Sequence, residues 1–325
     1  MADNSRIEWT DATWNPVTGC SVLSPGCTNC YAMQLAGTRL RHHPSRAGLT
    51  IDTKAGPVWN GKVRLNEQWL AQPFAWRKPR MIFVCAHGDL FHEDVPDEWI
   101  DQVFAIMALA PRHTFQVLTK RAERMRKYVD DAVGRVIARA DGDWPGWPLP
   151  NIWLGVSAER QQEADQRIPE LLATPAAVRF ISAEPLLGPI DLRAISTAGI
   201  GSAAGNKLSD VLHWAIVGGE SGQGARPMHP AWARSLRDQC HSAGIPFFFK
   251  QWGEYWPAEI SRRGEEGEIW RTQPTGKDVW FFDERHAADP PTIRHHRIGK
   301  GKAGRLLDGV EHNGMPRPRG ERKAA

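Results

Sequence analysis

Short apolar runs alternate with amphipathic segments along most of this chain. The intervening segments repeat apolar residues every three or four positions, as helices that cover a sheet do, for example at 97–110 and 230–243. Repeated strand–helix units predict an α/β fold with a parallel sheet, and we expect a complete or partial (β/α) TIM-like barrel. A doubly wound open sheet is the alternative. The runs with the length of buried strands are 81–85, 114–118, 151–156, 178–181, 212–217 and 245–249.

The alternation ends near Trp252. We expect residues 1–252 to form the barrel, interrupted by an irregular, basic insertion at 41–80. Residues 253–325 contain tryptophans broken up by glycine and proline, which predicts a small β-rich appendage followed by a basic tail.

Two local signals predict further detail. Asn60-Gly61 lies between short β-prone runs, which predicts a hairpin across 58–63. Pro169 interrupts an otherwise helical stretch, and proline is best tolerated in the first turn of a helix. The sequence therefore predicts short helical pieces here, one of them starting at Pro169.

Composition is ordinary for a soluble globular protein, with 41% hydrophobic and 24% charged residues among 325. No apolar run approaches the length of a membrane span, and residues 1–6 lack the apolar core of a signal peptide. We therefore expect a cytoplasmic protein with no membrane partner. The net charge of +4 is uneven, because ten lysines and arginines face four acids from residue 285 onward. Such a tail is either a solvated end or a nucleic-acid contact.

Three of the five cysteines, Cys20, Cys27 and Cys30, lie within eleven residues. Thiols gathered this closely, without a secretory signal, predict a metal site rather than disulfides. A structural zinc ion needs a fourth ligand, for which Cys85 or His87 are candidates. The remaining interpretation is that the cysteines are small buried hydrophobic residues without a metal. We expect no other thiol near the three, so that loss of any one abolishes activity.

Polar residues close almost every predicted strand. In a barrel these positions share one face, which predicts an active site there. Helix capping is the structural alternative for Ser157, and an internal ion pair is the alternative for a lysine beside a glutamate. The residues concerned are His87, Asp89, Lys120, Arg121, Ser157, Glu159, Glu184, Glu220, Ser221, Lys250 and Gln251.

The cysteine loop resembles the cluster-binding loop of radical S-adenosylmethionine (radical SAM) enzymes. Its spacing is C-x6-C-x2-C where that superfamily usually has C-x3-C-x2-C, and Asn29 replaces a frequent aromatic residue, for which Tyr31 compensates. A wider resemblance is to a family of phage three-cysteine-motif proteins that are counted with the radical SAM group. The blocks that carry it are Ile7–Thr10, Trp14–Cys20, Leu118–Arg121, Ser182–Gly188 and Gly218–Ser221.

The resemblance implies a radical SAM type of barrel in which the three cysteines hold a [4Fe–4S] cluster with one iron open to S-adenosylmethionine. Gly218-Gly219-Glu220 has the letters of the motif that holds the methionine amino group, although here it follows a late strand instead of the second. The expected cofactor-binding residues are Gly218, Gly219, Glu220, Ser157 and Tyr31. The expected catalytic residues are Glu184, Lys120 and Glu159.

Family context implies modification of a base in phage DNA. The specific hypothesis is isomerisation of a glycyl group on the thymine methyl from nitrogen-linked to carbon-linked, which protects the genome from host restriction. The implied partners are DNA and an electron donor such as flavodoxin or ferredoxin, and the implied location is the host cytoplasm. The alternatives are a radical SAM enzyme acting on a peptide or small molecule, and a zinc-stabilised nucleic-acid-binding protein. Most tryptophans are expected to pack in the core, and the candidates for stacking on bases are Trp59, Trp256, Trp270 and Trp280.

Overall fold

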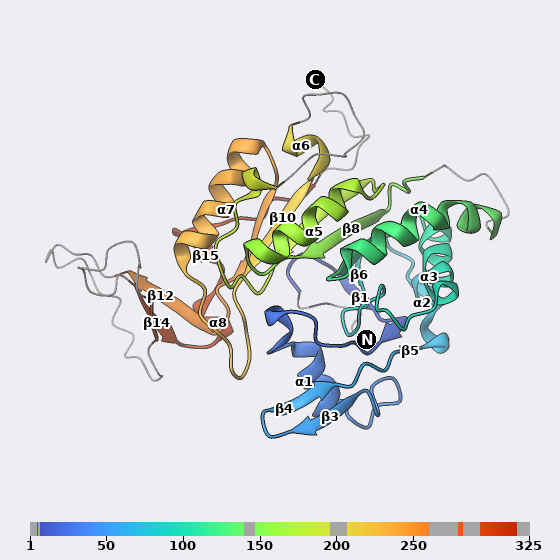
Figure 1. Ribbon diagram of the computed structural model, residues 1–325, viewed down its shortest axis with the longest axis horizontal. Coiled ribbons are helices and arrows are strands. Elements are labelled where there is room, and N and C mark those ends of the chain that lie inside the picture. Colours follow the sequence, from blue (N-terminus) through green and yellow to red (C-terminus); the bar gives the residue numbers. More distant parts are fainter. Residues whose placement is uncertain are drawn as a thin grey trace, which may run out of the picture.

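The computed structural model describes residue 5 and residues 7–139, 147–195, 207–259, 279–281 and 293–316. Seven parallel strands form a curled sheet, a half-barrel, in the order β1-β6-β7-β8-β9-β10-β11 (Figure 1). The expectation of a partial β/α barrel is therefore confirmed. The strands are β1 (Ala12–Trp14), β6 (Met81–Val84), β7 (Thr114–Thr119), β8 (Ile152–Ser157), β9 (Val178–Ala183), β10 (Trp214–Gly218) and β11 (Phe247–Gln251).

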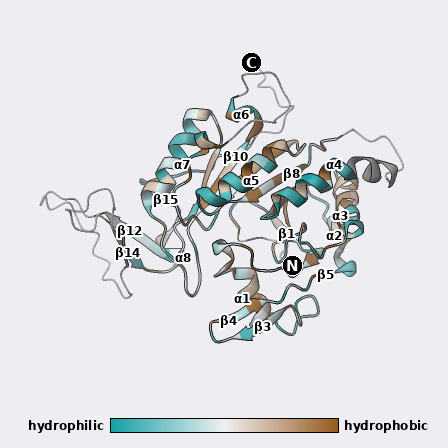
Figure 2. Cartoon of the chain, viewed as in Figure 1, coloured by the Kyte–Doolittle hydropathy of each residue, from teal (hydrophilic) through white to brown (hydrophobic). Residues whose placement is uncertain are grey.

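Amphipathic helices cover the convex face of this sheet. Hydrophilic residues are prominent on the outer sides of α5 and α7 (Figure 2). Apolar side chains of the covering helices join those of the strands in the main core. This burial of apolar surface holds helices and sheet together. The covering helices are α3 (Asp97–Leu109), α4 (Ala122–Arg139), α5 (Gln161–Ala173) and α7 (Pro230–Ala243).

A second apolar cluster fills the base of the concave face. Trp214, which has no exposed surface, lies at its centre, with the rings of Trp9, Trp153, Phe180 and Phe248 within 5.7–6.1 Å of it. Aromatic side chains thus occupy the lower half-barrel, and the space above them lies at the carboxyl ends of the strands.

Two local predictions are wrong. Pro169 lies inside α5, a single helix, because Ile168, Leu171 and Leu172 are fully buried and their packing outweighs the cost of an internal proline. The hairpin expected across 58–63 is also absent, because β4 pairs with β3 and β5 pairs with β2, so no two strands are joined by a turn at Asn60-Gly61.

The hairpin of the insertion lies earlier in the chain. It is formed by β3 (Thr50–Thr53) and β4 (Gly56–Trp59), with Gly56 at a positive φ of 112°. The next strand, β5 (Arg64–Leu65), pairs with β2 (Val17–Thr18), so the insertion is tied to the segment that precedes the cysteines. The β3–β4 hairpin packs on α1 (Tyr31–Gly37), and α2 (Gln72–Ala75) follows.

Beyond Trp252 the described residues form the expected β-rich appendage. Strands β12 (Tyr255–Glu259), β14 (Ile293–Arg297) and β13 (Val279–Phe281) make a small antiparallel sheet. Trp256 packs partly buried against the main core. Trp270, the Trp280 side chain and the tail at 317–325 lie outside the residues described. The remaining elements are α6 (Leu208–Val211), α8 (Lys300–Ala303), β15 (Leu306–Leu307) and β16 (Val310–Glu311).

The last described segment returns to the half-barrel and covers the outer edge of β11. Asn313 bridges to Phe248 in antiparallel fashion, and the Phe249 amide donates to the His312 carbonyl at 2.9 Å. The Trp214 indole donates to the Gly314 carbonyl at 2.7 Å. This return segment, residues 312–314, is thereby fixed to both the edge and the aromatic cluster.

Among the described helices, none combines the length and the apolar character needed to cross a lipid bilayer.

Candidate active site

The carboxyl ends of the strands surround one cavity of about 430 Å³. The loops that follow parallel strands lie at the same edge of a sheet, which is why residues far apart in sequence meet here. Three residues of the predicted site, His87, Glu159 and Gly218, do not line the cavity. Those that do are Cys20, Cys27, Cys30, Tyr31, Asp89, Lys120, Arg121, Ser157, Glu184, Gly219, Glu220, Ser221, Lys250 and Gln251.

The cysteine loop, residues 19–30, forms one wall. A single 3-10 turn, η1 (Pro25–Cys27), carries Cys27, and helix α1 begins directly after Cys30. Burial raises the pKa of Cys30, and the α1 backbone amides partly offset that rise. Burial, with Asp89 nearby, raises the pKa of Cys20 to about 12. At neutral pH both thiols are therefore protonated unless a bound cation stabilises their thiolates.

Glu159, at the end of β8, fixes the middle of this loop. Its carboxylate accepts from the Ser24 hydroxyl at 2.8 Å and forms ion pairs with Lys120 at 3.4 Å and Arg167 at 2.9 Å. A Cβ on Gly26 would fall 2.2 Å from the same carboxylate, so only glycine allows the loop to approach this closely. Burial alone would raise the pKa of Glu159, but the two cations bring it below its ordinary value. Glu159 is thus an ionised anchor behind the loop.

Glu220, after β10, makes a second attachment. It accepts from the Asn29 amide at 3.0 Å and pairs with the Arg226 guanidinium at 2.6 and 2.8 Å. Arg226 in turn donates to the Pro25 carbonyl at 2.9 Å. The carboxylate that the resemblance assigns to the cofactor is therefore engaged by the cysteine loop and its supporting arginine.

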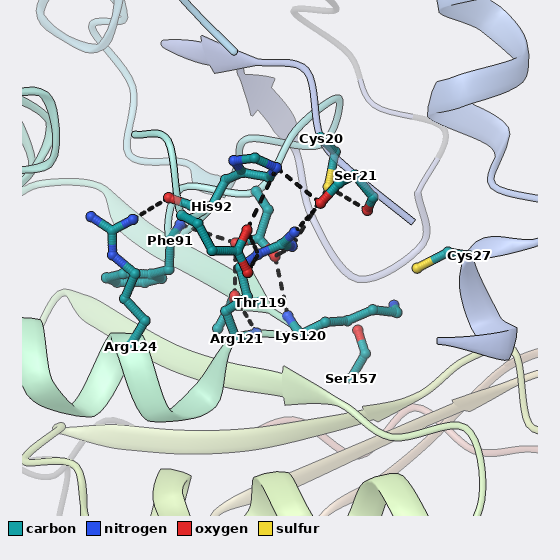
Figure 3. Close-up of polar contacts among 12 residues, drawn as sticks. Cys20, Ser21, Cys27, Phe91, His92, Thr119, Lys120, Arg121, Arg124 and Ser157 are labelled. Carbon is teal, nitrogen blue, oxygen red and sulfur yellow. Dashed lines mark hydrogen bonds and ion pairs between the residues drawn. The ribbon is translucent and has the colours of Figure 1, made fainter. Parts of the chain in front are cut away.

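Arg121, after β7, holds the start of the loop. Its guanidinium lies 3.7 Å from the Cys20 sulfur, donates to the Ser21 hydroxyl at 2.7 Å and pairs with Asp89 at 3.0 Å (Figure 3). The Lys120 side chain extends instead toward Cys27 (Figure 3). The ends of β7, β8 and β10 thus each supply a cation or an anion to the cysteine loop.

A separate ion pair lies elsewhere on the cavity wall. The Lys250 ammonium donates to both Glu184 oxygens at 2.8 and 2.9 Å, and the Gln251 amide donates to one of them at 3.0 Å. The internal ion pairs weighed as alternatives for Lys120 and Lys250 are therefore present, with Glu159 and Glu184 respectively.

The two glycines before Glu220 have packing roles. A Cβ on Gly219 would fall 2.0 Å from the Trp252 carbonyl oxygen, so the backbones after β10 and β11 approach at a distance only glycine permits. A Cβ on Gly218 would lie 3.2 Å from the Glu184 carboxylate, so the absence of a side chain at Gly218 leaves room for that carboxylate.

Ser157 and Tyr31 both face the cavity. Ser157 is buried and does not cap α5, whose N-cap residue is Arg160, so the capping alternative is wrong. The Tyr31 hydroxyl donates to the Ala86 carbonyl at 2.6 Å, which fixes the first turn of α1 to the end of β6.

Aromatic side chains complete the wall. Trp59 comes from the insertion, Phe83 from β6 and Trp9 from the N-terminal segment, whereas Lys300 of α8 lines the cavity from the C-terminal side. The cavity is therefore bounded by the half-barrel, the insertion and the C-terminal region together.

A family profile described as "Protein of unknown function (DUF5131)" matches residues 4–316. The chain belongs to the DUF5131 family. No curated protein and no solved structure matches it.

The donor set of this DUF5131 protein fits an iron–sulfur cluster. Three thiols from one short loop line a single cavity, and cysteine thiolates are the usual ligands of such clusters. Among the described side chains, no three of His, Cys, Asp and Glu are grouped as they are around a single metal ion. His87 instead lies 3.5 Å from the Arg46 guanidinium.

A fourth cysteine also lines the cavity. Cys85, directly after β6, has a positive φ of 57° and a buried side chain. Burial raises the pKa of the Cys85 thiol to about 12. It is the natural comparison for tests of the three loop cysteines.

Sequence reasoning on this DUF5131 chain missed the residues that attach the cysteine loop. Asn29 and Arg226 lie in loops without a periodic pattern, and no local signal pairs either with Glu220. Arg121 was visible as a polar residue after a predicted strand, and only the fold places it beside Cys20. Trp9 lies in the Ile7–Thr10 block, but its place in the cavity wall depends on its packing against aromatic residues from distant strands.

Proposed function

We propose that this protein is a radical SAM enzyme that modifies a base in DNA. The observation that carries the proposal is the placement of Cys20, Cys27 and Cys30 on one wall of a cavity at the carboxyl ends of a half-barrel's strands. The sequence resemblance described above supports the same chemistry and the finer assignment to the radical SAM type of barrel.

The three loop cysteines would hold a [4Fe–4S] cluster. When bound, that group supplies the electron with which S-adenosylmethionine is cleaved to methionine and a hydrogen-abstracting 5′-deoxyadenosyl radical, the electron coming from a donor such as flavodoxin or ferredoxin.

The chain's own residues position the cysteine loop and shield the cavity. Glu159, Glu220 and Arg121 keep the cysteine loop in one place through partly buried, charge-assisted hydrogen bonds. Trp9, Trp59 and Phe83 give the cavity a partly apolar wall, which would shield a reactive radical from water on that side. Glu184 and Lys250 remain to orient a polar substrate group.

The substrate that we propose is a thymine carrying a glycyl group on its methyl, which is isomerised from the nitrogen-linked to the carbon-linked form without net gain or loss of atoms. Basic composition supports a DNA substrate, since the insertion at 41–80, which reaches the cavity at Trp59, has eight lysines and arginines against two acids, and Lys300 lines the cavity from the C-terminal side. The modified base would leave the helical stack to reach the cavity. The reaction would take place in the cytoplasm of a phage-infected host.

Metal analysis of anaerobically purified protein tests the cofactor. We expect about four irons and four sulfides per chain, with broad visible absorption. Cys20→Ser should lose this absorption, whereas Cys85→Ser, a buried thiol on the same cavity, should keep it. A colourless protein with one zinc per chain would exclude the radical proposal and favour a zinc-stabilised binding protein.

Nucleoside analysis tests the reaction. DNA carrying the nitrogen-linked glycyl thymine is incubated anaerobically with protein, S-adenosylmethionine and reductant, then digested and separated by chromatography with mass spectrometry. We expect an isomer of unchanged mass but different retention and fragmentation. An unchanged nucleoside, in a preparation that cleaves S-adenosylmethionine, would direct the search to peptides and small molecules.

A further inference from the structure

Glu184, Lys250 and Gln251 form a cluster whose hydrogen bonds differ from those of the other charged groups around the cavity. The contacts of Lys120, Arg121 and Glu220 run to the cysteine loop or its supports. The Glu184 carboxylate accepts from both the Lys250 ammonium and the Gln251 amide, and the Glu184 and Lys250 side chains both line the cavity. Their side chains keep 18% and 13% of their surface exposed, so a ligand in the cavity can reach the pair.

Gln251 presents an acceptor that lacks a partner. Its amide nitrogen donates to Glu184 and, at 3.4 Å, to the Gly219 carbonyl, which fixes the orientation of the amide. Its oxygen is buried and has no hydrogen-bond partner among the described residues, although the residue is only 3% exposed and lines the cavity. A buried polar atom without a partner is costly, so a donor from a ligand would be favourable here.

We propose that Glu184, Lys250 and Gln251 bind the zwitterionic amino-acid group of the substrate; this inference rests on the proposed function. A nitrogen-linked glycyl group carries a secondary ammonium with two N–H donors and a carboxylate. The ammonium donates to Glu184 and to the unpartnered Gln251 oxygen, and the carboxylate accepts from Lys250.

Charge balance favours this class of ligand over a simple anion or cation. A ligand with one charge would leave either Glu184 or Lys250 without its partner in a largely buried site, which is costly. A zwitterion gives each side chain a new partner of the right sign as the internal pair opens. The number of buried charges without a partner therefore stays at zero.

Two molecules in the proposed reaction contain such a group, the substrate and the methionine part of the cofactor. We assign the site to the substrate, because the glycyl group has a secondary ammonium whose two donors match the two acceptors. The test must separate the two sources.

The test measures binding of free nucleosides by calorimetry to anaerobically purified protein, with no turnover required. The probes are the thymidine that carries nitrogen-linked glycine, its glycinamide, its N-acetyl derivative, and methionine. We expect the zwitterion to bind about tenfold to a hundredfold more tightly than the amide or the N-acetyl compound. Lys250→Gln should abolish discrimination against the amide, and Glu184→Gln should abolish discrimination against the N-acetyl compound.

The double variant Glu184→Gln/Lys250→Gln is the control for misfolding of the single variants, because it removes both charges and leaves neither one unpaired. This double variant should fold and should bind all three nucleosides equally. Glu170→Gln, which breaks an ion pair with Arg126 between the outer helices, is the matched control and should keep the full preference. Unchanged discrimination in Lys250→Gln, or loss of methionine affinity with nucleoside affinity intact, would overturn the inference. Iron content and cleavage of S-adenosylmethionine, measured separately, report whether the proposed function itself fails.

Discussion

Single carboxylates with several partners determine how the site is held. Glu159 has no exposed side-chain surface, and its charge is shared among Lys120, Arg167 and the hydroxyl of Ser24. Loss of an ion pair's partner inside a protein is more damaging than absence of the whole pair, because a charge remains buried.

Glu159→Ala should therefore destabilise the protein by about 3–5 kcal/mol and loosen the cysteine loop. Glu159→Gln keeps an acceptor for the Ser24 hydroxyl and should lose less stability than Glu159→Ala. Urea unfolding measures the loss of stability, and the alkylation rate of Cys27 in metal-free protein measures the loosening of the cysteine loop. An alkylation rate for Glu159→Ala equal to that of the parent would show that this carboxylate does not anchor the loop.

His87 makes stability depend on pH. Burial first, and the nearby Arg46 second, lower its pKa to about 3, whereas an unfolded histidine titrates near 6.5. Between these values the unfolded chain binds one more proton than the folded chain, so stability falls as pH falls from about 6.5 toward 3, by up to about 1.4 kcal/mol per pH unit.

Replacement of this ring should remove that dependence. The unfolding free energy of His87→Gln, measured at several pH values between about 4 and 6, should have a shallower slope than that of the parent. His42→Gln changes an exposed histidine and serves as the control. Equal slopes in parent and His87→Gln would refute the assignment.

At the level of elements, the end of β10 shows what the sequence could and could not predict. Strands and covering helices follow from hydrophobic spacing, and most polar residues at the predicted strand ends line the cavity, although His87 and Glu159 do not. The resemblance assigned the two glycines to a cofactor, an assignment that remains a prediction. Their close contacts with Trp252 and Glu184 depend on the register of β11 beside β10, which no local pattern encodes.

These contacts predict different costs at adjacent positions. Gly219→Ala places a methyl group against a backbone carbonyl and should cost about 3 kcal/mol, because backbone cannot easily move. Gly218→Ala meets a side chain that can shift and should cost less than about 1.5 kcal/mol. Chemical denaturation of both variants gives the comparison, and equal costs would contradict the observed register.

At the level of the whole molecule, two basic regions meet at one cavity. Trp59 and Lys300 line it from opposite parts of the sequence, and the exposed Lys62 lies beside Gly19 at the start of the cysteine loop. Composition indicated that both regions are basic. Their meeting could not be predicted, because it depends on pairing of β5 with β2 and on the return of the chain after Trp252.

If DNA crosses this cavity, Lys62→Gln and Lys300→Gln should each weaken its binding. Each lost phosphate contact reduces the slope of log affinity against log salt by about 1. Fluorescence anisotropy with a labelled oligonucleotide at several salt concentrations measures this slope. Lys127→Gln, on the outer surface of α4 and paired with Glu123, is the control. Salt-independent binding, or equal slopes for all three variants, would argue against a DNA track here.

The return segment at 312–314 has one more consequence. It occupies backbone donors and acceptors that β11 would otherwise offer to water. A version of the protein shortened to end before His312 would present an open β-edge, with the Phe248 and Trp214 rings less well covered. The open edges of two such molecules could pair with each other. Shortening at this end should therefore first reduce solubility in concentrated samples.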